Sequence, residues 1–284
     1  MDPAHRDSAW INLFSSCSDT AAALLLTASA TAIPLIPYPA IPVFVASAML
    51  FAFRVLIAKA RQNPSAGLFL NPKAAGLLLL ILPCGAFFAA ISVGPTTLTA
   101  TALLILAVCF TEFWLKENRI AQSVGNGIIR GLNLLLGFSA VPEIILIKNP
   151  LSFSLCLGGY VCIFSVMTSG NSGKRVIDFH PLLLIPLLVW AAVFLLFGGF
   201  QIDGWIILSM LTILILLSVW MKVEAETFFL IGSSGIFAVN AATAGADGTI
   251  VYTLIVLSMT LPWLLLNHML REKPSELPVA GRIQ

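Results

Sequence analysis

Apolar residues fall along this chain in long blocks that carry almost no charge and are separated by short polar breaks. A helix that crosses the hydrocarbon of a bilayer needs about 20 mostly apolar residues. Ten segments meet that requirement: Thr20–Ile36, Ala40–Leu56, Ala74–Val93, Thr96–Leu115, Ser123–Pro142, Leu151–Met167, Pro181–Phe200, Gly204–Met221, Thr227–Ala244 and Thr249–Met269. The pattern predicts an all-α, polytopic membrane bundle of about nine to ten spans in a single domain.

Two of the polar breaks form turns between predicted spans, and one of the ten segments allows two interpretations. Pro37, Tyr38 and Pro39 separate the first two segments, and Gly94-Pro95 forms the turn that a hairpin between the third and fourth requires. The ninth segment, Thr227–Ala244, contains four glycine and serine residues in a row and Asn240. It is predicted either to cross the membrane or to form a half-helix packed inside the bundle.

The positions of Lys and Arg predict the orientation. Cytoplasmic loops collect these residues. With ten spans and both termini in the cytoplasm, twelve of them lie on the cytoplasmic side, Lys148 lies opposite, and Arg54 and Arg130 lie within spans. We expect a protein integral to the plasma or inner membrane, with residues 271–284 as a disordered cytoplasmic tail.

The composition agrees with lipid as the main solvent. Hydrophobic residues make up 59% of the chain and charged residues 10%, whereas a soluble domain carries about 25% charged residues. No basic cluster indicates nucleic acid as a partner. The cysteines form no CxxC pair and the histidines have no ligand spacing, so no metal site and no cofactor is evident from these residues.

Arg130 lies on a polar face of the fifth predicted span. Asn126, Arg130, Asn133 and Gly137 are spaced at i, i+4, i+7 and i+11, which places them on one side of a helix. Small and amide residues of this kind often form a hydrogen-bonded seam between membrane helices. A charge within a span usually faces the bundle interior and has a partner, and the arginine favours a cavity lining over a seam.

Two further charged residues lie near the cytoplasmic ends of spans. Arg54 either extends to the headgroup layer beside Lys59 and Arg61 or contacts an anion at the mouth of a cavity. Glu112 lies on the order of 5 Å deep and Arg130 on the order of 10 Å deep, at ~1.5 Å of rise per residue. A Glu112–Arg130 ion pair between neighbouring helices is therefore feasible.

These depths suggest one polar pocket in the cytoplasmic third, built by the second, fourth and fifth spans beneath the loop at residues 59–73. Asn240 lies apart, toward the opposite side, where a core hydrogen bond would account for it. The candidate substrate-binding residues are Arg54, Lys59, Arg61, Glu112, Asn126, Arg130 and Asn133. No catalytic residue is assigned.

The order of these features resembles the UbiA superfamily of intramembrane prenyltransferases, in particular its EboC-like branch. The most specific piece is Arg130-Gly-Leu-Asn-Leu-Leu-Leu-Gly137, which is similar to the fifth-helix segment of that branch. Trp10-Ile-Asn-Leu-Phe14, Asn71-Pro-Lys-Ala-Ala75 and the long loops after the second and sixth spans agree with it. The resemblance implies a helical bundle that holds a prenyl diphosphate, with Mg²⁺ bound by two Asp-rich motifs.

The carboxylates that such a metal site needs are missing here. Mg²⁺ binds through carboxylates together with substrate phosphate. No acidic residue occurs between Asp19 and Glu112, and the loop after the sixth span contains only Asp178. The Asp-rich motifs are thus absent, and no metal ligand can be assigned from the resemblance.

Three hypotheses about function follow. The first is a prenyltransferase in which Arg54, Lys59, Arg61 and Arg130 hold the diphosphate in place of metal, since arginine binds phosphate with two parallel hydrogen bonds. The second is a non-catalytic subunit that binds an isoprenoid or another lipid and works with a membrane-protein partner. The third is a small-molecule transporter with a discontinuous ninth span.

Overall fold

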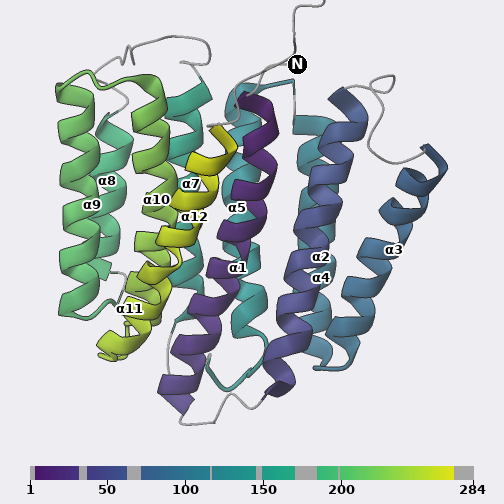
Figure 1. The fold of residues 1–284 in the computed structure, drawn as a ribbon. Helices are drawn as coiled ribbons and strands as arrows, with labels where there is room; N and C mark the ends of the chain where they lie inside the picture. Colours follow the sequence, from purple (N-terminus) through teal and green to yellow (C-terminus); the bar gives the residue numbers. More distant parts are fainter. Residues whose placement is uncertain are drawn as a thin grey trace, which may run out of the picture.

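The protein is helical throughout the part that the computed structural model describes. The described residues are 4–31, 37–62, 72–115, 117–144, 149–169, 184–197 and 199–271, and no strand occurs among them. The helices stand side by side with their long axes roughly aligned (Figure 1). This arrangement confirms the all-α membrane bundle that the hydrophobic pattern predicts.

The helices follow the apolar segments closely, and several begin at a proline, whose missing N–H is not needed in the first turn. Their bounds are α1 Ala4–Thr31, α2 Pro37–Gln62, α3 Pro72–Ile91, α4 Pro95–Phe110, the π-helical turn η1 Thr111–Leu115, α5 Arg119–Phe138, α7 Pro150–Ser169, α8 Leu184–Phe197, α9 Ile202–Trp220, α10 Ala225–Ala244, α11 Ile250–Ser258 and α12 Thr260–Arg271. Gly94 makes the turn between α3 and α4 with a φ of 154°, which favours glycine.

Two apolar cores lie on either side of a central pair of helices. One core is built mainly from α7, α8, α9 and α10, and the other from α2, α3 and α4. Both α1 and α5 contribute to each core, for example through Leu26 and Leu24 of α1 and through Leu134 and Ile129 of α5. The two helices stand between the two groups in Figure 1.

The outer surface of the bundle is apolar, as a lipid environment requires. Large side chains such as Leu80, Phe88 and Met210 are mostly exposed. Exposed tryptophans lie near both ends of α9, at Trp205 and Trp220, which is the arrangement of aromatic anchors at the two membrane interfaces. These features identify an integral membrane protein.

Six helical stretches in the described residues are long and apolar enough to cross a membrane. They are Pro39–Ala60, Ala74–Ile91, Pro95–Leu115, Pro150–Thr168, Ile202–Trp220 and Thr227–Ala244. Helices α1 and α5 are not among them, because their inward faces carry polar side chains that lower the mean hydropathy. The count of nine to ten spans, and the side on which the termini lie, stay predictions.

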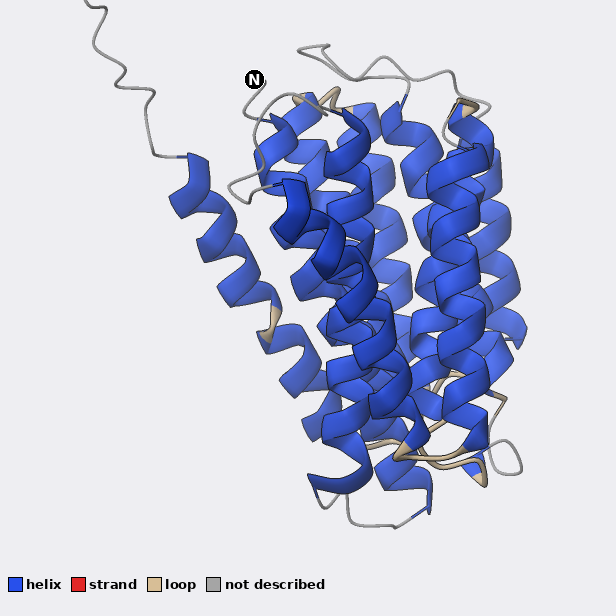
Figure 2. Ribbon diagram, turned by 90° about the vertical axis from the view of Figure 1, so that its right-hand side faces the viewer, coloured by secondary structure: helices blue, strands red, loops and turns tan. Residues whose placement is uncertain are grey.

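Three sequence expectations change in the structure. Helix α1 begins at Ala4 rather than near Thr20, so Asp19 lies inside a helix and not before one. Helix α10 is continuous over Ala225–Ala244, so the half-helix alternative for the ninth segment is wrong. The last segment is broken at Met259 (Figure 2), because the proline at 262 blocks the carbonyl four residues earlier.

Some expectations fall outside the described residues. These are the disordered tail, apart from Arg271, and most of the two long loops.

Helices α5 and α7 approach each other through small residues. A Cβ atom placed on Gly127 would lie 2.4 Å from the carbonyl oxygen of Gly158, and one placed on Gly131 would lie 2.9 Å from that of Ser154. The two helices are antiparallel here, with a small residue at every fourth position on each. Close backbone approach of this type drives association of membrane helices.

We therefore expect Gly127→Ala to destabilise the fold by about 1–3 kcal/mol, since the added methyl group meets a backbone atom that cannot rotate away. Gly76→Ala on α3 is the matched control, because nothing lies within 4 Å of its Cβ position. Unfolding of both variants in mixed detergent micelles by increasing SDS is the measurement. Equal midpoints for the two variants would contradict the close α5–α7 contact.

Candidate functional site: a buried polar network around Asp19

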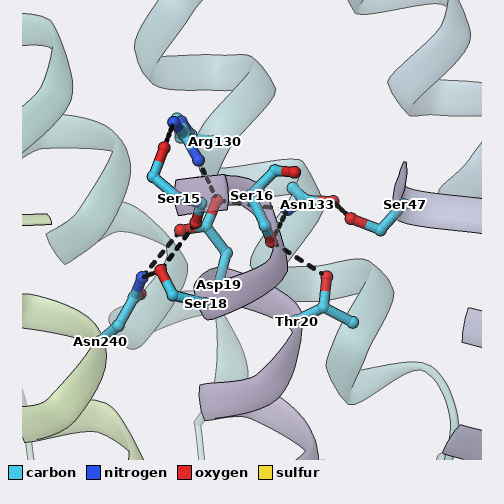
Figure 3. Close-up of polar contacts among 9 residues, drawn as sticks. All are labelled: Ser15, Ser16, Ser18, Asp19, Thr20, Ser47, Arg130, Asn133 and Asn240. Atoms are coloured by element: carbon cyan, nitrogen blue, oxygen red, sulfur yellow. Dashed lines mark hydrogen bonds and ion pairs between the residues drawn. The ribbon is translucent and has the colours of Figure 1, made fainter. Parts of the chain in front are cut away.

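Asp19 of α1 is the centre of the largest polar cluster in the described part of the bundle. Its Oδ2 atom accepts a hydrogen bond of 2.8 Å from Nη1 of Arg130 and one of 3.2 Å from Nδ2 of Asn133. Its Oδ1 atom accepts one of 2.8 Å from Nδ2 of Asn240. Figure 3 shows these side chains, from α5 and α10, converging on the carboxylate.

The turn of α1 that precedes Asp19 supplies the remaining partners. Arg130 also donates to the hydroxyl of Ser15, and Asn133 donates to the carbonyl of Ser16 at 2.9 Å. Asn240 donates to the hydroxyl of Ser18 at 2.8 Å. Because serine is small, this turn lets α5 and α10 approach α1 closely while it offers them oxygen acceptors.

Helix α2 is the fourth helix that contributes to the network, after α1, α5 and α10. The hydroxyl of Ser47 donates to Oδ1 of Asn133 at 2.8 Å. The guanidinium carbon of Arg130 lies 5.0 Å from the centre of the Phe51 ring, which is within the range of a cation–π contact. Four helices are thus joined through one carboxylate, one guanidinium and two amides.

All of these groups are excluded from solvent. Asp19, Asn133 and Asn240 are 0% exposed and Arg130 is 2% exposed. A charge buried without its partner costs several kcal/mol, so the two charged residues stabilise the fold only together. The carboxylate of Asp19 is already occupied by three donors, which leaves it poorly suited to act as a base or as a metal ligand.

A second cluster joins α2, η1 and α5. Arg54 donates from Nε to Oε1 of Glu112 at 3.1 Å and from its terminal nitrogen to Oδ1 of Asn126. Glu112 lies in the π-helical turn η1, and such turns commonly mark a local departure from regular helix packing at functional sites. The side chain of Arg54 is 14% exposed, so this pair is less enclosed than Asp19–Arg130.

The ion pairs in the structure therefore differ from the pair that the sequence suggested. The expected Glu112–Arg130 pair is wrong: Glu112 binds Arg54, and Arg130 binds Asp19. Asn240 also does not stand apart, because it hydrogen-bonds to Asp19. The physical reason is that α1 extends further toward its N-terminus than its hydropathy indicates, which places a second carboxylate inside the bundle.

The seven candidate residues separate into three groups. Arg54, Glu112 and Asn126 meet in one cluster, while Arg130 and Asn133 belong to the Asp19 network. Lys59 is exposed on α2, and the side chain of Arg61 lies outside the described residues. Their role as substrate-binding residues stays a prediction.

Sequence reasoning missed the α1 half of the network. A usable signal was present, because Ser15, Ser18 and Asp19 recur at i, i+3 and i+4, the spacing that shares one helical face. Ser47 gave no signal, since an isolated serine in an apolar helix most often bonds its own backbone.

A separate apolar groove lies between α5 and α7, on a different face of α5 from the network. Its volume is about 340 Å³. Gly127, Gly131, Gly158 and Gly159 contribute to its lining, with leucine and isoleucine side chains around them. None of the described residues that line it is charged.

The residues that the structure describes do not fit a magnesium site. Mg²⁺ needs several oxygen ligands that face an open position. In the described ranges no three His, Cys, Asp or Glu side chains come together, and the two carboxylates at the centre of the bundle are both engaged by arginine. Asp178 lies outside the described residues.

Comparison with known proteins identifies the fold. No protein-family profile matches the chain, and no curated protein matches it. A solved structure of a digeranylgeranylglyceryl phosphate synthase, studied for its biosynthesis in membranes, is similar at a TM-score of 0.53 and 13% sequence identity. The match covers 91% of this chain and 100% of that one, so the two chains share a fold.

We expect Asp19→Asn to lower the free energy of unfolding by about 3–5 kcal/mol, because the guanidinium of Arg130 loses its counter-charge inside the bundle. Glu224→Gln makes the same chemical change at an exposed position before α10 and should have little effect. The midpoint of SDS-induced unfolding measures both. A native-like Asp19→Asn variant would show that the pair does not hold the bundle together.

Double-mutant cycles can test which charged residues pair. In each cycle the two members of a pair are replaced by neutral residues, singly and together, for Asp19–Arg130, Arg54–Glu112 and Glu112–Arg130. Groups in direct contact show coupling energies of about 0.5–3 kcal/mol. We expect coupling in that range for the first two pairs and a much smaller value for the third. A Glu112–Arg130 coupling as large as the others would restore the pairing that the sequence suggested.

Proposed function

We propose that this protein binds a neutral isoprenoid lipid within the membrane and does not perform metal-dependent prenyl transfer. The observation that carries this proposal is the state of the two central carboxylates. Asp19 and Glu112 are each bound to an arginine, at 2.8 Å and 3.1 Å. Neither is available to hold the metal that ionises a prenyl diphosphate.

The fold supports the isoprenoid part of the proposal. The similar solved structure is named for digeranylgeranylglyceryl phosphate synthesis, so that protein acts on prenyl groups. Folds host many functions, and a shared fold by itself favours a ligand class without establishing chemistry. The uncharged groove between α5 and α7 gives an apolar chain a place to bind within the membrane.

A metal-free prenyltransferase is the second candidate, and one observation favours it. The side chain of Arg54 is 14% exposed and Lys59 is exposed on the same helix, so two cations lie at one edge of the bundle. Arg130 cannot assist them, because it is 2% exposed and bound to Asp19. Among the described residues of this edge, Lys59 and the neutralised Arg54 would hold a diphosphate less firmly than clustered metal ions do.

The continuous helix α10 disfavours the transporter hypothesis. That hypothesis rested on a discontinuous ninth span, and α10 is a continuous helix of 20 residues. A partner protein in the membrane remains part of the proposal, since a binding subunit without turnover acts through another protein.

We expect the purified protein to bind radiolabelled geranylgeraniol and geranylgeranyl diphosphate with affinities that differ by less than about tenfold, or ~1.4 kcal/mol. Affinities should be the same with Mg²⁺ and with EDTA, and no diphosphate should be released. Scintillation proximity and a diphosphate assay are the measurements.

Two outcomes separate the candidates. Much tighter binding of the diphosphate that is lost in Arg54→Gln and Lys59→Gln would favour the metal-free enzyme. Release of diphosphate only with Mg²⁺ would contradict the proposal and show that the metal-dependent reaction persists.

A further inference from the structure

We propose that α12 is a movable strap, which swings about the break at Met259 and is held against the bundle by one docked side chain, Trp263. The strap opens and closes over the face of α10 that carries Phe237, and it thereby regulates the access of membrane lipids to that face. This motion needs no bound ligand, so it is independent of the proposed function.

The break between α11 and α12 provides the hinge. Helix α11 ends at Ser258 and α12 begins at Thr260. Pro262 has no N–H with which to tie its turn to the turn before it. The hydroxyl of Thr260 bonds to the carbonyl of Leu257, so this turn is closed partly by a side chain. Helices bend at such places, where the backbone ladder is interrupted.

The two halves of the last segment are attached to the bundle differently. Helix α11 places Val256 in the larger of the two apolar cores, with Tyr252 and Leu257 packed against it. Among the side chains that the structure describes, residues 260–265 of α12 add none to either core. Figure 1 shows α12 running obliquely to the other helices. The hinge therefore joins a well-packed half to a loosely packed one.

Trp263 is the only buried side chain among the described residues 260–265. It is 1% exposed and forms a small separate cluster with Phe237 of α10, with the two ring centres 5.8 Å apart. Leu261, Leu264 and Leu265, close to it on the same helix, are exposed. Helix α12 thus docks through one aromatic side chain rather than through a continuous packed face.

The docked position leaves one polar group unsatisfied. The indole N–H of Trp263 has no hydrogen-bond partner among the described residues, and a buried donor without a partner costs free energy. Trp190 on α8 is also buried, but its indole N–H donates to the carbonyl of Cys156 at 2.9 Å. Of these two buried indoles, Trp263 is the one that gains a hydrogen bond when it moves toward lipid carbonyls or water.

The lipid environment lowers the cost of release. In water, undocking a tryptophan would expose a large apolar surface, but lipid tails are as apolar as the side chains of a neighbouring helix. Helix α12 also keeps its backbone hydrogen bonds as it moves, because they lie within the helix. The docked and released states differ mainly in the packing of one side chain, so both are populated.

Release of α12 uncovers a defined face of α10. Phe229 and Leu230 pack against the Phe237–Trp263 contact and lie about two turns before Phe237 on α10. Asn240, one turn further along, hydrogen-bonds to Asp19, which holds α10 in place while α12 moves. A lipid that packs on this face has to displace Trp263, and this competition is what makes the strap regulatory.

The test measures distances between spin labels in the full-length protein in lipid nanodiscs, by double electron–electron resonance. One pair joins Leu265→Cys on α12 to Ile213→Cys on α9, and the control pair joins Ile255→Cys on α11 to the same position on α9. All three positions are exposed. The native cysteines, none of which lies in α9, α11 or α12, are replaced by alanine.

We expect Trp263→Ala to lengthen or broaden the α12–α9 distances and to raise the ratio of released to docked protein at least about tenfold, because it deletes the buried docking side chain. The α11–α9 distances should not change. Leu264→Ala is the matched control, since Leu264 is the next residue on α12 but is exposed, and it should leave both distributions as they are.

Two results of this experiment would overturn the proposal. Unchanged α12–α9 distances in Trp263→Ala would show that another contact holds α12. A shift of both pairs would show that α11 and α12 move as one rod without a hinge at Met259.

Motion in the protein with its native tryptophans is tested by incorporating 5-fluorotryptophan and recording fluorine saturation-transfer spectra. Trp263→Phe and Trp190→Phe assign the two resonances. We expect Trp263 to exchange with a minor state populated at about 1–10%, and Trp190, whose indole is hydrogen-bonded in the larger core, not to exchange. No exchange at Trp263 would overturn the proposal, even if Trp263→Ala does not fold.

Discussion

The ion pair between Asp19 and Arg130 is the contact on which the centre of this bundle depends. Two opposite charges lie fully enclosed between apolar cores, where either one alone would be strongly unfavourable. Because Asn133 and Asn240 donate to the same carboxylate, the pair also fixes the positions of α5 and α10 against α1. In lipid, where packing provides no hydrophobic driving force between helices, hydrogen bonds of this kind help to select one arrangement.

The same pairing limits the chemistry that the fold can perform. Metal-dependent ionisation of a prenyl diphosphate needs carboxylates that face the ligand and hold the metal. Here the carboxylate of Asp19 is surrounded by donors from the protein itself, and Glu112 is bound by Arg54. These charged residues bind one another across the helices, and this pairing is the reason why we propose binding without metal-dependent turnover.

The sequence was informative wherever periodicity within one segment decides the outcome. It predicted most of the helices, the Gly94-Pro95 turn and the shared face of Asn126, Arg130 and Asn133. It failed where the answer depends on which helices touch, because depth along a span restricts pairing without choosing the partner. Asp19 was placed outside the membrane since serines and charges lower the hydropathy of α1, yet those residues are polar because they bind α5 and α10.

Helix α5 contacts its neighbours in two different ways on its two faces. One face is fixed by Arg130 and Asn133, whose partners come from α1 and α2. The other face has glycines in place of large side chains and packs on α7 through backbone atoms. The Cβ positions of Gly127 and Gly131 are taken up by carbonyl oxygens of α7, so this face is closed by its neighbour. The polar contacts and the backbone contacts together hold α5 between α1 and α7, so this helix joins the two halves of the bundle.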